Sequence, residues 1–328
     1  DRQPEDVMKS AIDAIKAEGY TGVWGAAGDH LQTREDVFRV AEAGYTFFTI
    51  DPSEFVNNSA DAMGEGELED AYQELVDEDV LTDRNLLQIY LNQIEQVASD
   101  YVISFNSPVL LLRAIVKYGA ALNFARDMYN WIEEANPHRK FEVEISVDET
   151  ETPTTPLEHL FIGLNLKRLG LRIVSLAPRF VGEFEKGIDF KGDIVEFEKQ
   201  YAQHVAIAKY CGPYKLSIHS GSDKFSVYPI MGRLSGEYLH VKTAGTSYLE
   251  ALRVICRTDI PLFREIIGFA RSRFEADKKT YHVSAQLSMI PEEITDTELE
   301  AVYLDQVPGR QVLHVTFGST LKGGQDSQ

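Results

Sequence analysis

Short runs of β-branched and aromatic residues alternate with longer stretches of helical periodicity along most of this chain. This alternation is typical of strands that are followed by helices in a parallel α/β fold. We predict eight strands from the pattern. They cover residues 22–27, 45–50, 141–147, 172–177, 214–219, 237–243, 280–285 and 311–317.

Eight strands with helical connections predict a (β/α)8 barrel of the TIM type, formed as a single catalytic domain by residues 1–328. Residues 52–139, between the second and third strands, are too many for a simple crossover. Their periodicity predicts helices at about 66–78, 84–103 and 108–135, so we expect a helical insertion within the barrel. The main alternative is an open doubly wound sheet, although no Gly-x-Gly-x-x-Gly sequence follows a predicted strand.

Five of the predicted strands place polar or ionisable residues on one side and mainly apolar residues on the other. In the third strand, odd-numbered residues from Phe141 to Val147 are apolar, and even-numbered residues from Glu142 to Asp148 are polar. Alternate residues of a barrel strand point inward, where Val, Ile and Leu normally fill the space. Burying this many polar groups costs several kcal/mol unless they pair or bind a ligand. The pattern therefore predicts a polar interior.

Five of the eight histidines lie on or directly after predicted strands. They are His30, His219, His240, His282 and His314. A hydrogen-bonded interior histidine is the simpler explanation for any one of them. Neutral imidazole is, however, the commonest metal ligand in proteins, and four of the five share the inward parity. For the group as a whole, we expect at least two metal ligands.

Three loops follow the carboxyl ends of strands, where barrel enzymes carry their active sites. Asp29-His30 follows the first strand, Asp148-Glu149-Thr150-Glu151 the third, and Ser220-Gly221-Ser222-Asp223-Lys224 the fifth. A Gly/Ser loop allows backbone N–H groups to approach an oxygen-rich ligand. A solvated turn with a helix cap, and a simple tight turn, are the simpler explanations for the second and third loops.

Basic side chains near these loops favour an anionic or polyhydroxylated ligand. Arg179, Lys224 and Lys242 would together form a local positive patch for a carboxylate or polyol. Asp51 and Arg179 end the second and fourth strands, and each is equally compatible with a surface position.

The overall charge narrows the classes of partner. The chain has 32 Lys and Arg residues against 52 Asp and Glu, a net charge of −20, which disfavours nucleic-acid and membrane-surface binding. Cys211 and Cys256 form neither a CxxC motif nor a disulfide framework, which fits the cytoplasm. No apolar run reaches the roughly 18 residues of a membrane span, and no signal peptide precedes the first strand.

Longer blocks at the strand ends carry a family resemblance. They are Asp29-His30-Leu31, Ala43 to Pro52, Ser146 to Thr154, Ser175 to Gly182, His219 to Phe225, His240 to Thr246 and His314 to Ser319. Across these blocks, the chain resembles the tagaturonate/fructuronate epimerase family of the bacterial hexuronate pathway. Family members are longer at both ends, which raises the expectation that this chain is truncated at both ends.

The resemblance implies an isomerase that depends on one divalent metal ion (Zn, Ni, Mn or Co) and interconverts D-tagaturonate and D-fructuronate, with tagatose and fructose as related ketoses. The two uronates differ at a carbinol carbon β to the ketone, so enolisation cannot invert it. Two routes remain for the epimerisation: retro-aldol cleavage with re-addition, and transient oxidation by a nicotinamide. The chain shows no dinucleotide motif, so we expect no nicotinamide and favour the retro-aldol route.

Roles follow for the residues at the predicted barrel mouth. We expect His30, His219 and His240 to bind the metal and Asp29 and Glu149 to act as base and acid. The expected substrate-binding residues are Asp51, Arg179, Ser220, Lys224 and Lys242. Asp148, His282 and His314 are further candidates for the same site.

Two other functions stay open at this point. A metal-dependent aldose–ketose isomerase or a class II-type aldolase would use the same barrel and metal. A non-catalytic sugar-acid-binding protein would need only the binding groups, although the histidines and the Asp148–Glu151 carboxylates occur together here. The partner expected in each case is a small molecule, and the sequence leaves homo-oligomerisation open.

Overall fold

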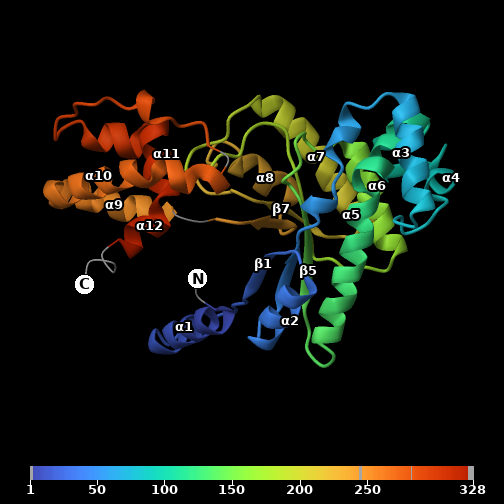
Figure 1. Cartoon of the computed structure of the whole chain (residues 1–328), viewed down its shortest axis with the longest axis horizontal. Helices are drawn as coiled ribbons and strands as arrows, with labels where there is room; N and C mark the ends of the chain where they lie inside the picture. Colours follow the sequence, from blue (N-terminus) through green and yellow to red (C-terminus); the bar gives the residue numbers. More distant parts are fainter. Residues whose placement is uncertain (1–2, 244–245, 282, 324–328) are drawn as a thin grey trace. The chain divides into compact units, whose positions relative to one another are not determined.

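A computed structural model describes residues 3–243, 246–281 and 283–323 of the chain (Figure 1). The chain divides into two compact units. The first unit comprises Asp1–Val181, Glu198–Ser217 and Leu234–His240. The second unit comprises Gly182–Phe197, Ile218–Arg233 and Val241–Gln328.

Helices and strands alternate along much of the chain, as the sequence pattern predicts. The strands are β1 (Ala27–Leu31), β2 (Phe47–Ile50), β3 (Ile94–Ala98), β4 (Tyr101–Ser104), β5 (Glu142–Val147), β6 (Ser175–Pro178), β7 (Lys215–Ile218) and β8 (Leu239–Val241). The α-helices are α1 (Pro4–Ala17), α2 (Arg34–Glu42), α3 (Glu65–Asp77), α4 (Leu86–Tyr90), α5 (Pro108–Ala135), α6 (Pro156–Arg168), α7 (Ile194–Cys211), α8 (Tyr228–Ser235), α9 (Thr246–Thr258), α10 (Ile260–Asp277), α11 (Val307–Val315) and α12 (Phe317–Lys322). Short 3-10 turns are η1 (Ser53–Phe55), η2 (Asn58–Asp61), η3 (Lys278–Thr280) and η4 (Leu287–Met289), and η5 (Ala301–Asp305) is a π-helical turn.

The main sheet has six strands in the order β1-β2-β5-β6-β7-β8, and the five strands from β1 to β7 pair in parallel. The α/β class is therefore confirmed, but the prediction of a closed (β/α)8 barrel is wrong. Within the residues that the structure describes, β1 and β8 are the two edges of an open, half-barrel sheet. Five of the eight predicted strands, from 45–50 to 237–243, are found. The predicted first strand 22–27 meets β1 only at Ala27, so Asp29 and His30 lie within β1 and not in a loop after it. The described residues of the last two predicted strands are not strands.

The predicted strand 311–317 lies mainly in helix α11. Gln306 precedes this helix and a proline occupies its first turn, a position that favours helix initiation. Val312, Leu313 and Val315 are all buried, so the apolar run reflects a helix that is covered on several sides. A short apolar run of this kind does not distinguish a buried strand from a buried helix by periodicity.

The predicted strand 280–285 fails for a different reason. Side chains, instead of a neighbouring strand, accept its backbone hydrogen bonds. Ser284 donates its N–H to Glu185 Oε2 at 2.7 Å, and Ala285 donates its N–H to Gln311 Oε1 at 2.9 Å. Both acceptors are distant in sequence, so the local pattern of residues carries no sign of them.

The insertion 52–139 forms two of its three predicted helices. Helices α3 and α5 confirm the predictions at 66–78 and 108–135. The predicted helix 84–103 is wrong beyond Tyr90, because α4 ends there and the antiparallel hairpin β3–β4 follows. Asn92, at φ 64°, adopts the left-handed conformation that commonly ends a helix.

Helix α5 packs between the sheet and the neighbouring helices of the first unit (Figure 1). Its length and composition alone would allow it to cross a membrane, but most of its apolar stretch is buried against the protein. Phe141 contacts Phe48 of β2 and Tyr129 of α5 edge to face. This aromatic contact ties α5 to the outer, apolar face of the sheet, as the strand alternation predicts.

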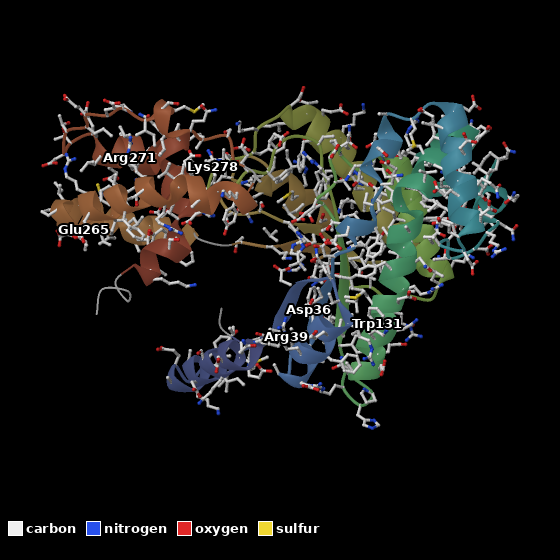
Figure 2. All side chains as sticks on the ribbon, viewed as in Figure 1. Asp36, Arg39, Trp131, Glu265, Arg271 and Lys278 are labelled. Carbon is white, nitrogen blue, oxygen red and sulfur yellow. The ribbon has the colours of Figure 1, made fainter. Side chains whose placement is uncertain are left out.

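Helix α2 has an N-terminal cap and a surface ion pair, both formed by residues close together in the sequence. Asp36 donates its N–H to Thr33 Oγ1 at 3.1 Å, which caps the helix. Asp36 and Arg39, labelled in Figure 2, then form an ion pair at 2.6 Å one turn apart. The Thr155–Glu158 capping box of α6 is formed in the same way.

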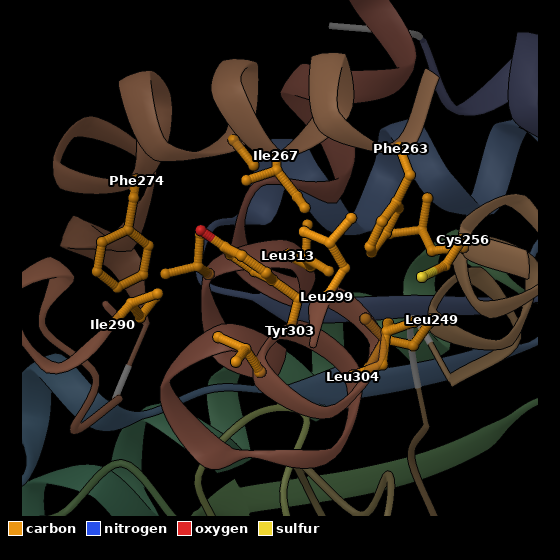
Figure 3. Packing of buried hydrophobic residues seen from close by; sticks show 14 of the residues in the cluster. Leu249, Cys256, Phe263, Ile267, Phe274, Ile290, Leu299, Tyr303, Leu304 and Leu313 are labelled. Atoms are coloured by element: carbon orange, nitrogen blue, oxygen red, sulfur yellow. The ribbon is translucent and has the colours of Figure 1, made fainter. Parts of the chain in front are cut away.

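The second unit has its own hydrophobic core, shown in Figure 3. Phe263, Ile267 and Phe274 project from one side of α10 at helical spacing. They pack with Leu299, Tyr303, Leu304 and Leu313, which come from the segment that leads into and forms α11.

Candidate functional site

A buried carboxylate lies at the centre of the sheet's polar face in the first unit. Glu144 on β5 is wholly inaccessible to solvent. It accepts hydrogen bonds from Thr49 Oγ1 on β2 at 3.2 Å and from Ser175 Oγ on β6 at 2.6 Å. His240 Nδ1 on β8 lies 2.8 Å from Glu144 Oε2. The polar interior predicted from the alternation is therefore confirmed here.

The contacts of His240 also reveal how strongly the sheet curves. Strands β5 and β8 are three positions apart, which would be about 14 Å in a flat sheet. The ring of His240 nevertheless reaches Glu144, and it meets the ring of Phe47 on β2 edge to face at 5.4 Å between centroids. The sheet must therefore curl around these side chains, as a barrel sheet does.

A second histidine, His30 on β1, is also paired with a buried carboxylate. His30 Nδ1 lies 3.2 Å from Asp51 Oδ2. Gln32 Nε2 donates to the same oxygen at 2.9 Å, and Ser53 N–H donates to Oδ1 at 3.0 Å. Burial would raise the pKa of Asp51, but the hydrogen bonds from His30 and Ser53 outweigh it and lower this pKa to about 2. Asp51 is thus an ionised partner of His30.

The expected base, Asp29, lies next to His30 and is partly exposed. Its Oδ1 is 3.9 Å from His30 Nε2, with about half of the Asp29 side chain accessible to solvent. His30 has φ 50°, in the left-handed region that is uncommon for residues other than glycine. This backbone conformation falls at the irregularity in the pairing of β1 with β2, between Gly28 and Leu31.

The acidic loop after β5 is held by groups from two other parts of the first unit, η2 and the segment after β6. Asn58 Oδ1 of η2 accepts the N–H of Glu151 at 3.0 Å. Arg179 donates from its guanidinium to the carbonyl of Thr150, and its backbone pairs with Thr154 at 2.8 and 3.1 Å. Asp148 accepts a hydrogen bond from Ser146, whereas the side chain of Glu149 is exposed. The loop therefore presents Glu149 from a fixed backbone.

Lys117 of α5 also stabilises the segment that contains this loop. Its side chain is completely buried, and Nζ lies 2.9 Å from Asp61 Oδ2 and 3.3 Å from Glu158 Oε1. Nζ also donates to Thr152 Oγ1 at 2.9 Å. The insertion thus anchors the acidic loop through a buried ion-pair cluster.

We expect Lys117→Met to destabilise the first unit by about 3–5 kcal/mol, because removing the lysine leaves the buried Glu158 and the partly exposed Asp61 without their counter-charge. Urea unfolding, followed by a probe in the first unit, measures this loss. Lys140→Met, an exposed substitution just after α5, serves as the matched control and should change the unfolding free energy by less than about 0.5 kcal/mol. Equal stability of the two variants would contradict the ion-pair role.

The Ser220–Lys224 loop lies in the second unit and is built around a buried lysine. Lys224 Nζ donates to the carbonyls of Ser222, Glu185 and Ile188 at 2.9, 2.8 and 2.5 Å. Burial lowers the pKa of Lys224 to about 8. The three protons of its ammonium group have backbone acceptors, so the geometry gives Lys224 a role in shaping the loop.

Other candidate residues of the second unit lie around this loop. His219 and Ser220 are half-buried at the end of β7, and Ser220 adopts φ 51°. Lys242 is half-buried after β8, and its carbonyl accepts the N–H of Gly221 at 2.9 Å. His282 lies outside the described residues.

His314 lies on a buried helix instead of a strand. Its side chain packs against Gly187, whose positive φ of 73° and lack of a Cβ permit the close approach. Burial, and then the positive charges of Lys186, Lys224 and Arg310, lower the pKa of His314 to about 4. His314 is therefore a neutral interior histidine at neutral pH.

Glu185 forms a second buried carboxylate centre in this unit. It accepts hydrogen bonds from Lys191 Nζ at 2.8 Å, Gln311 Nε2 at 2.7 Å and Ser284 N–H at 2.7 Å. Burial would raise the pKa of Glu185, but these hydrogen bonds outweigh it and lower this pKa to about 2. The carboxylate thereby joins three separate segments of the second unit.

We expect Glu185 to make the stability of the second unit depend on pH between about 4.5 and 2. A carboxyl whose pKa is lowered in the folded state stabilises it above the ordinary value of 4.5, and this stabilisation is lost as pH falls towards 2. The stability gap between the parent and Glu185→Gln should therefore narrow over this range in acid unfolding curves. Glu265→Gln, at an exposed site on α10 (Figure 2), is the control, and a gap that does not change with pH would contradict the prediction.

Two of the predicted ligand histidines have the arrangement that metal-binding histidines commonly show. In His30 and in His240, Nδ1 faces a buried carboxylate, and Nε2 is the ring nitrogen that would bind a metal. Nε2 of His30 lies 3.9 Å from Asp29 Oδ1. Among the residues that the structure describes, no group of three or more His, Cys, Asp or Glu side chains is already assembled around a metal-sized space. The donor chemistry of the two histidines fits a divalent ion.

Comparison with known proteins decides the family. The family model described as UxaE, tagaturonate epimerase, matches residues 1–328. The chain belongs to the tagaturonate epimerase family. It is 43% identical over 319 residues to the tagaturonate/fructuronate epimerase of Thermotoga maritima, covering 97% of this chain and 64% of that relative.

Solved structures agree with the assignment to the tagaturonate epimerase family. The fructuronate–tagaturonate epimerase UxaE from Cohnella laeviribosi, in a complex with one glycerol, is 40% identical, with a TM-score of 0.87 over 95% of this chain and 62% of that chain. Its native form gives a TM-score of 0.85 over 94% of this chain. The chain thus spans a little under two thirds of the length of these relatives.

Several residues that build the site were not assigned a role from the sequence. Glu144 was recognised only as one polar residue of an alternating strand, and Thr49, Ser175 and Ser217 were not distinguished from other polar strand residues. Lys117 was hidden within an apolar helix. In the sequence, Lys117 stands out as a lysine within an apolar helix, and Glu144 as a glutamate between Val143 and Ile145. A charged residue in apolar surroundings usually needs a partner, which is the signal that points to both.

Proposed function

We propose that this protein epimerises D-tagaturonate and D-fructuronate, the reaction named for its relatives. The whole-chain match to the tagaturonate epimerase family carries this proposal. The polar face of the sheet supports it, because the first unit holds two histidines that are paired with buried carboxylates, and also Asp29 beside His30 and Glu149 in the loop after β5. These side chains supply ligand and proton-transfer groups in one unit.

We propose retro-aldol cleavage and re-addition as the route. A base takes the proton of the carbinol hydroxyl, the adjacent carbon–carbon bond breaks, and an aldehyde and an enediolate form. The aldehyde rotates to present its other face, the carbon–carbon bond forms again, and the new alkoxide takes a proton. Atoms and electrons balance without a redox cofactor, so the proposal includes no nicotinamide.

Asp29 and Glu149 are the proposed proton carriers. Asp29 lies within β1 and Glu149 in the loop directly after β5, and both side chains are exposed to solvent. They come from β1 and from the loop after β5, which are separated by β2 in the sheet. Groups on two strands suit a reaction in which the hydroxyl proton leaves on one side and returns on another.

The proposal also includes one divalent ion, Zn, Ni, Mn or Co, with His30 and His240 binding through Nε2. When bound, it supplies a Lewis acid for the ketone oxygen. His219 in the second unit remains a predicted ligand from the sequence. Asp51 and Glu144 hold the two histidine rings in place.

For substrate binding, we retain Arg179, Ser220 and Lys242 as predictions. Asp51 and Lys224 have positioning roles in the geometry described above. A small sugar acid is the expected partner. We also propose a cytoplasmic location, which fits two buried cysteines without a disulfide.

The decisive experiment incubates the metal-loaded protein with D-tagaturonate in D2O and follows the products by NMR. We expect D-fructuronate without deuterium at the inverted carbon, because the retro-aldol route never removes that C–H. A hydrazine trap should capture a small amount of aldehyde fragment.

Other products would identify a different function. An aldose would indicate an aldose–ketose isomerase, and accumulating fragments without the epimer would indicate an aldolase. Full metal occupancy with no turnover would indicate a sugar-acid-binding protein.

A further inference from the structure

Glu144 lies beneath His240 on the polar face of the sheet, and its carboxylate is wholly buried. Donors reach it from both neighbouring strands, β2 and β6, and the imidazole reaches it from β8. A buried carboxylate is costly unless it is paired, so this convergence on one side chain requires an explanation. His240 Nδ1 lies 2.8 Å from Glu144 Oε2 and 3.2 Å from Ser217 Oγ, so Glu144 is the nearer of its two partners.

The chemistry of the contact determines which ring nitrogen carries the proton. An ionised carboxylate only accepts hydrogen bonds. Against an ionised Glu144, His240 Nδ1 carries the hydrogen, since a bare nitrogen would set one lone pair against another at 2.8 Å. In the neutral ring, this leaves the lone pair on Nε2.

The surroundings of the ring hold it in this orientation. Phe47 packs edge to face against it at 5.4 Å between centroids, and Ser217 Oγ lies within hydrogen-bond distance of Nδ1. About a third of the His240 side chain is accessible to solvent, whereas Glu144 is not accessible at all. The carboxylate thus holds the buried edge of an imidazole whose other edge lies on the accessible side.

We propose that Glu144 is a positioning residue that holds His240 as the Nδ1–H tautomer and presents its Nε2 as a ligand or proton acceptor. The pair His30–Asp51 has the same arrangement on β1 and β2, with Nδ1 against a buried carboxylate. The role of Nε2 rests on the proposed function, but the tautomer does not. Carboxylates placed behind metal-binding histidines typically contribute about 10–100-fold to metal affinity or activity.

The tautomer is measured directly by long-range ¹H–¹⁵N correlation of the histidine rings at pH 8, on the full chain after metal removal by chelation. The His240 signal is assigned by its loss in His240→Gln. We expect the Nδ1–H pattern in the parent and a shift towards Nε2–H in Glu144→Gln, which keeps the shape but removes the charge. Glu142→Gln, an exposed change on the same strand, should leave the pattern unchanged.

Metal titration provides the second measurement. We expect Glu144→Gln to bind Mn²⁺ or Zn²⁺ about 10–100-fold more weakly than the parent, with Glu142→Gln unchanged. If Glu144→Gln does not fold, Glu144→Asp keeps the charge but withdraws the carboxylate, and the same two losses are expected.

An Nε2–H pattern for His240 in the parent would overturn the proposal without any variant. So would a folded Glu144→Gln that keeps both the tautomer and the metal affinity of the parent. Failure of the proposed function is recognised separately. In that case the parent does not epimerise the uronate, while the ring spectrum still reports whether Glu144 sets the tautomer.

Discussion

Glu149→Gln should lower kcat by about 10²–10⁴-fold while the protein keeps its metal, because the amide preserves shape but cannot transfer a proton. Glu149 is exposed at a loop whose backbone is fixed by Asn58 and Arg179, so the substitution should not disturb folding. KM should change little, since Glu149 is not assigned to substrate binding. Steady-state kinetics together with elemental analysis measures both quantities.

Asp148→Asn is the matched control for Glu149→Gln. Asp148 accepts a hydrogen bond from Ser146 on the same strand, so its loss should affect stability or metal affinity before turnover. If Asp148→Asn stops turnover with metal retained and Glu149→Gln is nearly normal, the two roles are exchanged. Parent-like behaviour of both variants would leave the loop as a helix cap only. Asp29→Asn should reproduce the kcat loss of Glu149→Gln.

Chelation should abolish activity, and Mn, Ni, Co or Zn should restore it. His240→Ala should then reduce both metal occupancy and rate, because it removes the proposed ligand Nε2. Glu144, which positions the ring, should not replace this lost ligand. Inductively coupled plasma analysis and the uronate assay give the two values in parallel. His219→Ala tests the remaining predicted ligand in the same way.

His138, an exposed histidine in the segment after α5, provides the control as His138→Ala. This variant should keep parent-like occupancy and rate. Unchanged metal occupancy in His240→Ala would show that His240 is not a ligand. Activity that survives complete chelation in the parent would exclude metal dependence altogether.

Five strands were predictable because the order of apolar and polar residues within each of them gives a strong local signal. Strand β5 alternates strictly, and its apolar residues Val143, Ile145 and Val147 are all buried. The same alternation placed Glu144 on the polar face and located the acidic loop at the end of the strand. Helix α5 was predicted with its observed bounds because 28 residues of helical periodicity lie between a serine cap and an asparagine end.

The two strands that were wrongly predicted are each explained by contacts with residues far away in the sequence. Residues 283–285 have a strand-like composition, but Glu185 and Gln311 accept the N–H groups that a strand would donate to a neighbour. Residues 311–315 look like a buried strand, but burial on several sides makes a helix equally apolar. Eight strand-like segments consequently suggested a closed barrel where the sheet has six strands.

The sequence by itself determined the α/β class, the polar face of the sheet and the loop that carries Glu149, because these depend on residues two to four positions apart. Only the tertiary structure decided which groups meet across the sheet. The curvature brings Glu144 of β5 against His240 of β8, 96 residues away. Such contacts depend on strand order and sheet curvature, which local periodicity does not encode.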